Sequence, residues 1–445
     1  MFKLRAPAGL ILLSALLPAC APTATQPPDS TALTAAIQRA AASSPITALT
    51  MTPTTGGLRV NGRLNGRLFT AQFPTDWNQQ AVYYTHGYTL PSPAQDTVAT
   101  DLITQDDTGG LIPEAYRQGF AVARTVYDKR GFAVRSGIEN TIALKRFIDQ
   151  VGVQRSYVTG GSMGGSVLMG LIEKYPTDFV GALSACGAVS DWQFQVKYLT
   201  DFRAVFNYFT AGTAYALPGT EDVTRSAPGL KGETMVKALG PLFLKAKLNP
   251  RGPEQQLLDR IVSAVPGVQA KADITTFFNT LAAQLFGLDD INATAGGIFV
   301  QNTDTVYTSS LLSAEDNAAL NRGIQRYTVS SPAAVAYQQD WYSATGRFQT
   351  KLLTYHNTAD ALVPFEHEAR LRARVEAAGN TANLVQQVVD PKLETLSRVL
   401  FLKLEGVTHC GFTPAQNVFA WNELRQWVET GTRPQDGLNI TRPPR

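Results

Sequence analysis

The segment Gly160-Gly161-Ser162-Met163-Gly164 constrains the fold of this chain more than any other. A β-prone run, Tyr157-Val158-Thr159, precedes it, and a run with helical spacing from Ser166 to Tyr175 follows it. Glycines on both sides of a serine allow the backbone to bend sharply and leave the serine oxygen exposed. The segment therefore predicts a strand, a tight turn and a helix, with Ser162 at the turn as a candidate nucleophile.

Other runs repeat this alternation of strands and helices along the chain. The strand-like runs are Leu58 to Asn61, Leu68 to Phe73, Ala81 to Thr85, Gly119 to Thr125, Phe179 to Ser184, Lys351 to Tyr355 and Val399 to Leu404. Glu139 to Gln150 and Ala415 to Trp427 have helical spacing. Such alternation favours an α/β fold with a mostly parallel central sheet flanked by helices.

One interval is too long for a simple connection. About 160 residues separate the strand near Ala185 from the strand at Lys351, although a crossover needs only a dozen or so. We therefore expect a large, mainly helical cap inserted at residues 191–345. Aromatic residues recur every four positions at its start, at Phe194, Tyr198, Phe202 and Phe206. They form either the core of the cap or a lid face lining an apolar substrate cleft, and these two interpretations are compatible.

The first twenty residues resemble an export signal. Lys3 and Arg5 precede an uncharged run, Ala6 to Leu17, that is too short to span a bilayer. The run ends at Leu17-Pro18-Ala19-Cys20, which resembles the lipobox of bacterial lipoproteins. This resemblance implies cleavage before Cys20, lipidation of Cys20 and an exported lipoprotein of the cell envelope. The alternative is an ordinary signal of a secreted or periplasmic protein.

The domain organisation follows from these boundaries. We expect a signal peptide at 1–19 and a tether at 20–48, where Ala, Thr, Pro and Ser are abundant. The two parts of the core are then 49–190 and 346–430, on either side of the cap, and a tail occupies 431–445.

The composition excludes several classes of function. The 445 residues are 44% hydrophobic and 17% charged, which suits a chain with a sizeable buried core. Lys and Arg number 39 against 36 Asp and Glu, so the chain lacks the charge excess of a nucleic-acid-binding protein. Three cysteines and four histidines leave little material for a metal centre, and we expect neither metal nor cofactor.

A serine nucleophile needs a general base, and that base needs an orienting carboxylate. His409 lies near the end of the chain, after the run Val399 to Leu404, and is the candidate base. Asp360 follows the strand-like run Lys351 to Tyr355 and is the candidate acid, with Asp390 and Glu405 as alternatives.

These residues together resemble the α/β-hydrolase superfamily of serine hydrolases. The resemblance rests on Tyr84-Thr85-His86-Gly87-Tyr88, the glycine-rich turn at Ser162, the Asp360 loop and Thr408-His409-Cys410. It implies a Ser162–His409–Asp360 triad and an oxyanion hole formed by the N–H groups of Met163 and Tyr88, with Gly87 as the alternative to Tyr88.

The other histidines receive structural roles. We expect the ring of His86 to brace its own loop. His356 and His367, on either side of Asp360, are expected to be structural or surface residues.

His409-Cys410 is also similar to feruloyl esterases and tannases, in which a cysteine beside the catalytic serine is bonded to the cysteine after the catalytic histidine. Here Gly161 precedes Ser162, and the nearest cysteine is Cys186, after the neighbouring strand. The resemblance therefore implies a Cys186–Cys410 disulfide, with two buried thiols as the alternative.

The implied reaction is hydrolysis of a carboxylic ester through an acyl-enzyme. We expect a bulky or aromatic ester, as a small molecule or a polymer, and contact with a membrane only through the lipid anchor. The alternatives are a serine peptidase of the prolyl peptidase type and a non-catalytic binding protein of the envelope.

Overall fold

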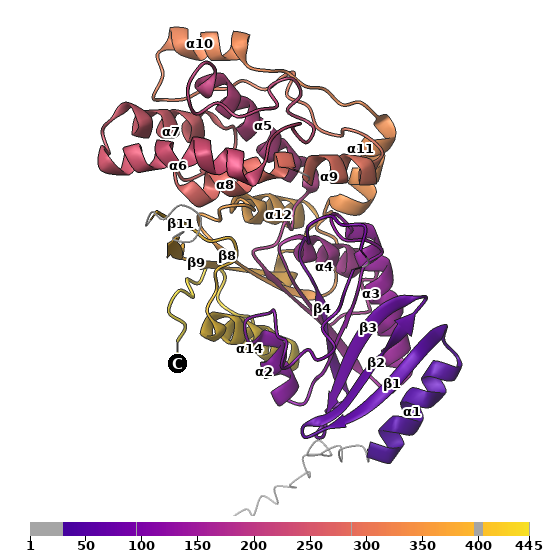
Figure 1. Ribbon diagram of the computed structural model, residues 1–445. Coiled ribbons are helices and arrows are strands. Elements are labelled where there is room, and N and C mark those ends of the chain that lie inside the picture. The colour runs from indigo at the N-terminus through magenta and orange to yellow at the C-terminus, as the bar shows by residue number, and fades with distance from the viewer. Residues whose placement is uncertain (1–29, 95, 286, 396–403, 445) are drawn as a thin grey trace, which may run out of the picture.

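A computed structural model describes residues 30–94, 96–285, 287–395 and 404–444 (Figure 1). The predicted signal peptide and Cys20 lie outside the described residues, and so does most of the predicted strand Val399 to Leu404. None of the helices in the described part is both long and apolar enough to cross a membrane.

A nine-stranded sheet forms the centre of the molecule, in the order β1-β2-β3-β5-β4-β6-β7-β8-β9. The first strands pair antiparallel, and every pair from β5 to β9 is parallel. The strands are β1 (Ile46–Thr54), β2 (Gly57–Leu64), β3 (Arg67–Pro74), β4 (Gln80–Thr85), β5 (Ala121–Thr125), β6 (Arg155–Gly161), β7 (Gly181–Ala185), β8 (Lys351–Asn357) and β9 (Leu384–Val389). This is the predicted fold class, an α/β-hydrolase fold with a mostly parallel sheet.

Local sequence explains the elements that the pattern predicted. Asn65 and Gly66 join β2 to β3 with φ of 50° and 77°, the left-handed backbone that a two-residue hairpin turn requires. The central strands are apolar on both faces, as β4 illustrates, since its neighbouring residues Val82 and Tyr83 point to opposite faces and both are fully buried. Such strands are stable only when helices cover both sides of the sheet.

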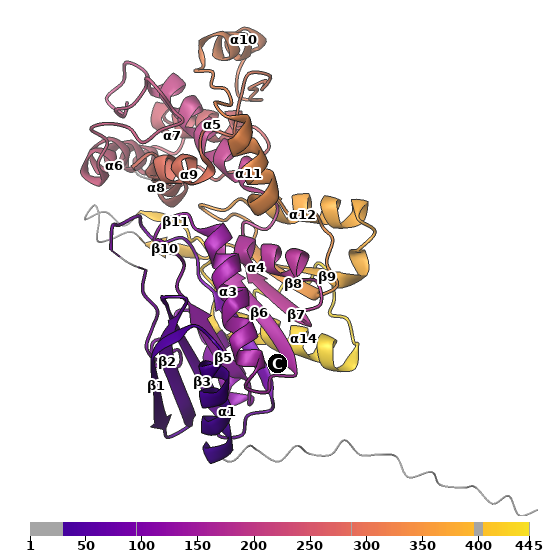
Figure 2. The same cartoon turned by 90° about the vertical axis from the view of Figure 1, so that its right-hand side faces the viewer.

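Helices cover the sheet on both faces (Figures 1 and 2). The helices α3 (Val134–Asp149), α4 (Met163–Lys174) and α12 (Glu366–Ala377) contribute to one hydrophobic cluster. The helices α2 (Leu111–Arg117) and α14 (Pro414–Thr430) contribute to the other. The carboxyl ends of the parallel strands lie between these two layers of helices, beneath the segment inserted between β7 and β8.

The second half of the predicted tether, residues 20–48, is folded and does not form a tether. Residues from Ser30 to Ala42 form α1, and β1 begins at Ile46. Leu33, Ile37 and Ala40 recur at helical spacing and are buried in the core, so this helix belongs to the globular body.

The chain between β7 and β8 forms a helical layer above the sheet, as Figure 1 shows. Its elements are α5 (Trp192–Thr210), α6 (Gly232–Leu248), α7 (Pro253–Ala264), α8 (Ile274–Ala282), a short 3-10 turn (Ala283–Leu285), α9 (Gly287–Ala295), α10 (Ala314–Gly323) and α11 (Pro332–Tyr342). We call this layer the cap.

Among the described residues, the edge strand of the sheet is β9, which the sequence did not predict, and the predicted strand Val399 to Leu404 lies mostly outside them. A short 3-10 turn, Thr381–Asn383, leads into β9, which pairs with β8 at the edge of the sheet. The strands β10 (Leu393–Thr395) and β11 (Glu405–Val407) form a separate two-stranded sheet. His409 therefore follows β11 of the small sheet and not a strand of the central one.

Candidate active site

Ser162 occupies the turn between β6 and α4 with a strained backbone, at φ 55° and ψ −127°. The flanking glycines allow this turn to pack on Thr85 at the end of β4. A Cβ atom at Gly160 would lie 2.1 Å from Thr85 Oγ1, and one at Gly164 would lie 2.1 Å from the carbonyl oxygen of Thr85. Any larger residue at either position would push the turn off the sheet.

Three predicted residues from distant parts of the chain meet at this turn. His409 Nε2 lies 2.9 Å from Ser162 Oγ, and His409 Nδ1 lies 2.8 and 2.9 Å from the two carboxylate oxygens of Asp360. This is the arrangement of a nucleophile, a general base and an orienting acid. Each residue follows a β-strand, namely β6, β11 and β8.

Asp360 is held as a buried carboxylate. Its Oδ1 accepts hydrogen bonds from the N–H groups of Leu362 and Val363, both at 2.8 Å, and its Oδ2 accepts one from the N–H of Cys410 at 3.1 Å. Burial alone would raise the pKa of Asp360, but the charge and hydrogen bond of His409 lower it below its usual value. The group is therefore an anion that fixes the imidazole with Nε2 facing Ser162.

The alternative acids lie elsewhere. Asp390 directly follows β9, but it is exposed and accepts a hydrogen bond from Asn439 Nδ2 at 3.1 Å. Glu405 begins β11 and is also exposed. Among the described residues neither carboxylate is hydrogen-bonded to His409, whereas Asp360 is.

Asp360→Asn is expected to lower kcat for an ester roughly 10⁴-fold while the protein stays folded, because an amide can donate to Nδ1 and hold the wrong imidazole tautomer. Steady-state kinetics on a p-nitrophenyl ester, with circular dichroism as the folding check, measure this effect. Asp390→Asn is the matched control and should keep at least half of the wild-type kcat. A loss with Asp390→Asn and none with Asp360→Asn would reverse the assignment.

Two backbone N–H groups, those of Met163 and Tyr88, are the predicted donors to an oxyanion. Met163 is the first residue of α4, and Tyr88 lies in the loop after β4. Among the described residues neither N–H donates a hydrogen bond. This loop touches the nucleophile, since a Cβ at Gly87 would lie 3.2 Å from Ser162 Cβ. The N–H of Gly87, the predicted alternative to Tyr88, also donates no hydrogen bond among the described residues, so the structure does not choose between the two. Met163 lies at the positive end of a helix dipole.

The ring of His86 braces this loop, as the sequence predicted. It stacks on Tyr127 with ring centroids 3.9 Å apart, and its Nε2 lies 3.1 Å from Asp96 Oδ2. Burial alone would raise the pKa of Asp96, but the hydrogen bond and charge of His86 lower it. Tyr127 also donates from its hydroxyl to the carbonyl oxygen of His86 at 3.1 Å. These contacts fix the loop that carries the Tyr88 N–H.

His356 and His367 are buried structural residues. His356 lies 3.0 Å from the carbonyl oxygen of Val363 through Nε2 and 3.3 Å from Glu368 Oε1 through Nδ1. His367 contacts Ser190 Oγ at 2.7 Å and Gln195 Oε1 at 3.0 Å. His356 therefore supports the loop that carries Asp360, and His367 joins α12 to Ser190 and α5.

A disulfide joins Cys186, just after β7, to Cys410, beside the candidate base. The pairing is the one that the sequence predicted. Cys186, His409 and Cys410 also place three potential metal-ligand atoms within 4.8 Å of one another. The two sulfurs are bonded to each other, however, and cysteine binds metals as a thiolate, so the bridge and not a metal holds this cluster.

Two pockets meet at Ser162 and share Tyr88. The cap-side pocket, of about 260 Å³, is lined by Tyr88, Leu90, Ser162, Trp192, Gln195, Leu199, Asn279, Ala282, Ala283, Gly287, Ile291, Leu362 and Val363. The sheet-side pocket, of about 480 Å³, is lined by Ser162, His409, Cys186 and Cys410 together with Tyr84, Gly87, Tyr88, Asp107, Thr108, Gly109, Leu111, Tyr355, Phe412 and Asn417. The residues 159–161, Ala185 and Gly411 complete it.

The aromatic residues proposed for the substrate cleft do not line it. Phe194, Tyr198, Phe202 and Phe206 are all buried, and none of them lines either pocket at Ser162. Phe202 instead packs edge-on against Phe277 of α8, with centroids 5.0 Å apart. The stripe is core, as the other interpretation of its spacing proposed. Trp192, Gln195 and Leu199, on another side of the same helix, face the pocket.

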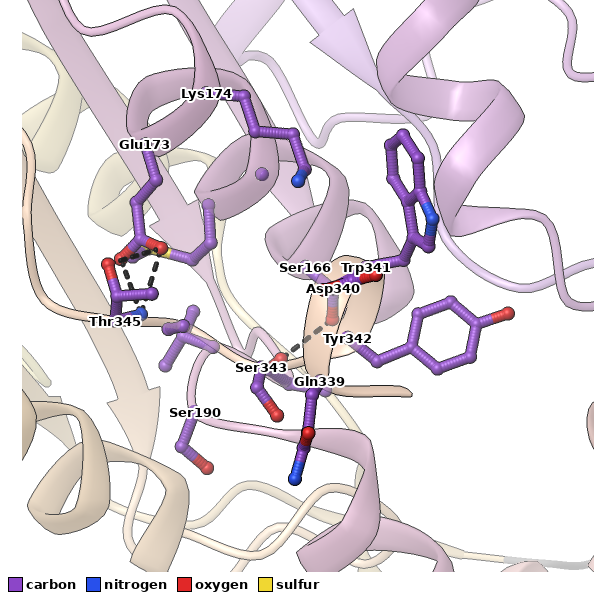
Figure 3. A pocket seen from close by; sticks show the side chains of 15 residues that line it. Ser166, Glu173, Lys174, Ser190, Gln339, Asp340, Trp341, Tyr342, Ser343 and Thr345 are labelled. Atoms are coloured by element: carbon purple, nitrogen blue, oxygen red, sulfur yellow. Dashed lines mark hydrogen bonds between the residues drawn. The ribbon is translucent and has the colours of Figure 1, made fainter. Parts of the chain in front are cut away.

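A third pocket of about 300 Å³ lies away from the triad, where the cap returns to the body between α4 and the end of α11 (Figure 3). Glu173 of α4 accepts hydrogen bonds from the N–H groups of Thr345 and Gly346, both at 2.8 Å. Trp341 lies under the cation of Lys174, which is 4.5 Å from the ring centroid. These contacts anchor the returning chain, and no triad residue lines this pocket.

Comparisons with known proteins find similar solved structures but no family. No protein-family model and no curated protein matches this sequence. An esterase from Aspergillus oryzae has a similar solved structure, with 14% identity over 87% of each chain and a TM-score of 0.46. Feruloyl esterase B from the same fungus has 12% identity over 90% of this chain and 91% of its own, with a TM-score of 0.46. Lipase A of Candida antarctica has 13% identity over 88% and 83%, with a TM-score of 0.39.

Proposed function

We propose that this protein is a serine hydrolase that cleaves carboxylic esters through an acyl-enzyme. The observation that carries the proposal is the continuous hydrogen-bonded chain from Asp360 through His409 to Ser162, beside two backbone N–H groups without acceptors. A structural serine would need none of these partners. Nucleophile, base, acid and oxyanion donors are the four parts that acyl transfer requires.

The reaction follows from these positions. His409 Nε2 takes the proton of Ser162 as the serine oxygen attacks the ester carbonyl, and Asp360 stabilises the imidazolium. The N–H groups of Met163 and Tyr88 donate to the developing oxyanion. His409 then gives the proton to the leaving alcohol, and a water molecule repeats the sequence to release the acid from Ser162. Groups already in the chain perform every step.

The cap-side pocket supports a substrate with a bulky apolar part. Its side chains are mostly apolar, and Leu199 and Ile291 are examples. Among the described residues that line the two pockets, Asp107 is the one Asp, Glu, Lys or Arg. A peptide carboxyl terminus thus has no cationic partner there, so we prefer an ester to a peptide substrate. Export and lipidation of Cys20 stay predictions from the sequence.

The test combines labelling with comparative turnover. A fluorophosphonate probe is expected to label one site, identified as Ser162 by peptide mass spectrometry, because only an activated serine reacts. In a panel of aryl esters and proline-containing anilides, kcat/KM should be at least 100-fold higher for the esters. No labelling would indicate the non-catalytic alternative, and faster anilide cleavage would indicate the peptidase.

A further inference from the structure

We propose that the two pockets at Ser162 divide the ester between them. The cap-side pocket holds the acyl group, which is apolar and up to the size of an aromatic ring on a short arm. The sheet-side pocket holds the leaving alcohol. This assignment rests on the proposed function and specifies its substrate.

The position of the base decides which pocket takes the alcohol. His409 must donate a proton to the leaving oxygen, so that oxygen has to lie within hydrogen-bond reach of Nε2. His409 and Cys410 line the sheet-side pocket, and neither lines the cap-side pocket. The alcohol therefore leaves on the sheet side. The acyl group, which stays on Ser162, extends to the other side, under the cap.

The lining of the cap-side pocket fits an apolar acyl group. Trp192, Leu199 and Ile291 present apolar side chains. Gln195 also lines the pocket, but its amide contacts His367 Nε2 and the carbonyl oxygen of Leu362, both at 3.0 Å, and is not free for a ligand. A cavity of about 150 Å³ holds a benzene molecule. A pocket of about 260 Å³ therefore has room for a ring and a short arm, and an acetyl group leaves most of it empty.

The sheet-side pocket is larger and has a more polar lining. Asp107, Thr108 and Asn417 contribute to it, and its volume is about 480 Å³. The amide of Asn417 is already hydrogen-bonded to Tyr355 Oη and to the carbonyl oxygens of Thr108 and Gly109, all at 3.0 Å. Asp107 lies 2.7 Å from Arg124, so its charge is paired, but its side chain is half exposed to solvent. This lining suits an alcohol that carries hydroxyl groups or continues into solvent.

Gly287 sets the size limit of the acyl pocket. It is the first residue of α9 and lines the cap-side pocket. Among the described residues, a Cβ atom at this position would meet only Tyr88 Oη, at 3.9 Å. Its φ lies outside the left-handed region, so a larger residue is sterically compatible with the backbone there. A side chain at position 287 would therefore extend into the space that the acyl group occupies.

The test uses Gly287→Leu and two series of esters. In the first series the alcohol is p-nitrophenol and the acyl group is acetyl or 3-phenylpropanoyl. In the second the acyl group is acetyl and the alcohol is methanol or 2-phenylethanol. Gly287→Leu should lower the ratio of kcat/KM for 3-phenylpropanoyl to acetyl at least tenfold, since one methylene in a filled pocket already costs 10-fold or more. The alcohol ratio, which is kcat/KM for 2-phenylethyl acetate divided by kcat/KM for methyl acetate, should change less than twofold.

Gly232→Leu is the matched control. Gly232 is also the first residue of a cap helix, α6, and no described atom lies within 4 Å of its Cβ position. Both ratios should stay at the wild-type value in this variant. Gly287→Ala tests the same position with a smaller change and should lower the acyl ratio by a smaller factor.

The outcomes separate the assignment from the proposed function. A fall of the alcohol ratio with a constant acyl ratio would reverse the two pockets. No change of either ratio in a folded Gly287→Leu protein would overturn the role of Gly287 and of the cap-side pocket. Failure of the wild-type protein to cleave any ester in either series would overturn the proposed function itself.

Discussion

Ser162→Ala is expected to lower kcat for a p-nitrophenyl ester on the order of 10⁶-fold. The alanine removes the atom that attacks the carbonyl, and the hydrogen bond of 2.9 Å to His409 Nε2 is lost with it. The remaining oxyanion donors and pockets still bind the ester, so a residual acceleration over water of 10³–10⁴ is the expected floor. Fluorophosphonate labelling should disappear in the same variant.

Ser166→Ala is the matched control for this prediction. Ser166 lies one helical turn further along α4, and its Oγ is buried, donating to the carbonyl oxygen of Ala188 at 2.7 Å and accepting from Trp192 Nε1 at 2.8 Å. Its loss should cost about 1–3 kcal/mol of stability because the Trp192 donor is left unpaired, while kcat stays within a few-fold of the wild type. A Ser162→Ala protein with more than one per cent of the wild-type kcat would contradict the assigned nucleophile.

The candidate site was predictable because its signals are local. The turn at Ser162 requires glycines at Gly160 and Gly164, and those requirements are visible in the sequence and confirmed by the packing on Thr85. Asp360 and His409 follow from the order of nucleophile, acid and base along the chain. Their contact is a property of the fold, since 49 residues separate them and they follow strands of two different sheets, β8 and β11.

The edge of the sheet was not predictable in the same way. The strand β9 contains Gln386 and Gln387 in the middle of an apolar run, which weakens its pattern. In the fold both glutamine side chains are buried at the sheet edge, and that of Gln386 is hydrogen-bonded. Gln386 Nε2 donates to the carbonyl oxygen of Glu368 at 2.9 Å, and Arg372 Nε donates to Gln386 Oε1 at 2.7 Å. Partners on α12 thus stabilise a strand that its own residues indicate only weakly.

The cap shows the limit of periodicity. The spacing of Phe194, Tyr198, Phe202 and Phe206 correctly predicts one buried helical face, but spacing cannot say what covers that face. In the structure α8 covers part of it through Phe277. The pocket-facing side of α5 carries Trp192, Gln195 and Leu199, and the polar Gln195 interrupts the apolar pattern on that side.

Removal of the Cys186–Cys410 bridge is expected to destabilise the protein by roughly 5 kcal/mol in the chain-entropy model, because the two cysteines are 224 positions apart. At ~2 cal/mol/K of unfolding entropy per residue, this corresponds to a fall in Tm of about 6 °C. The bridge also holds the loop of His409 against the end of β7, and the N–H of Cys410 donates to Asp360 at 3.1 Å. We therefore expect kcat to fall as well, since the triad depends on this loop.

The experiment compares Cys186→Ala/Cys410→Ala with the wild type, with and without a phosphine reductant, by thermal unfolding and ester turnover. Cys20→Ser is included in every protein, so that only this pair can contribute thiols. Reductant should lower Tm and kcat of the bridged protein and leave the double variant unchanged, which separates loss of the bridge from other effects of the reagent. Thiol titration of the denatured, unreduced protein should find none. Two titrating thiols would show that the cysteines are unpaired, and the stability of the His409 loop would then have to come from its hydrogen bonds alone.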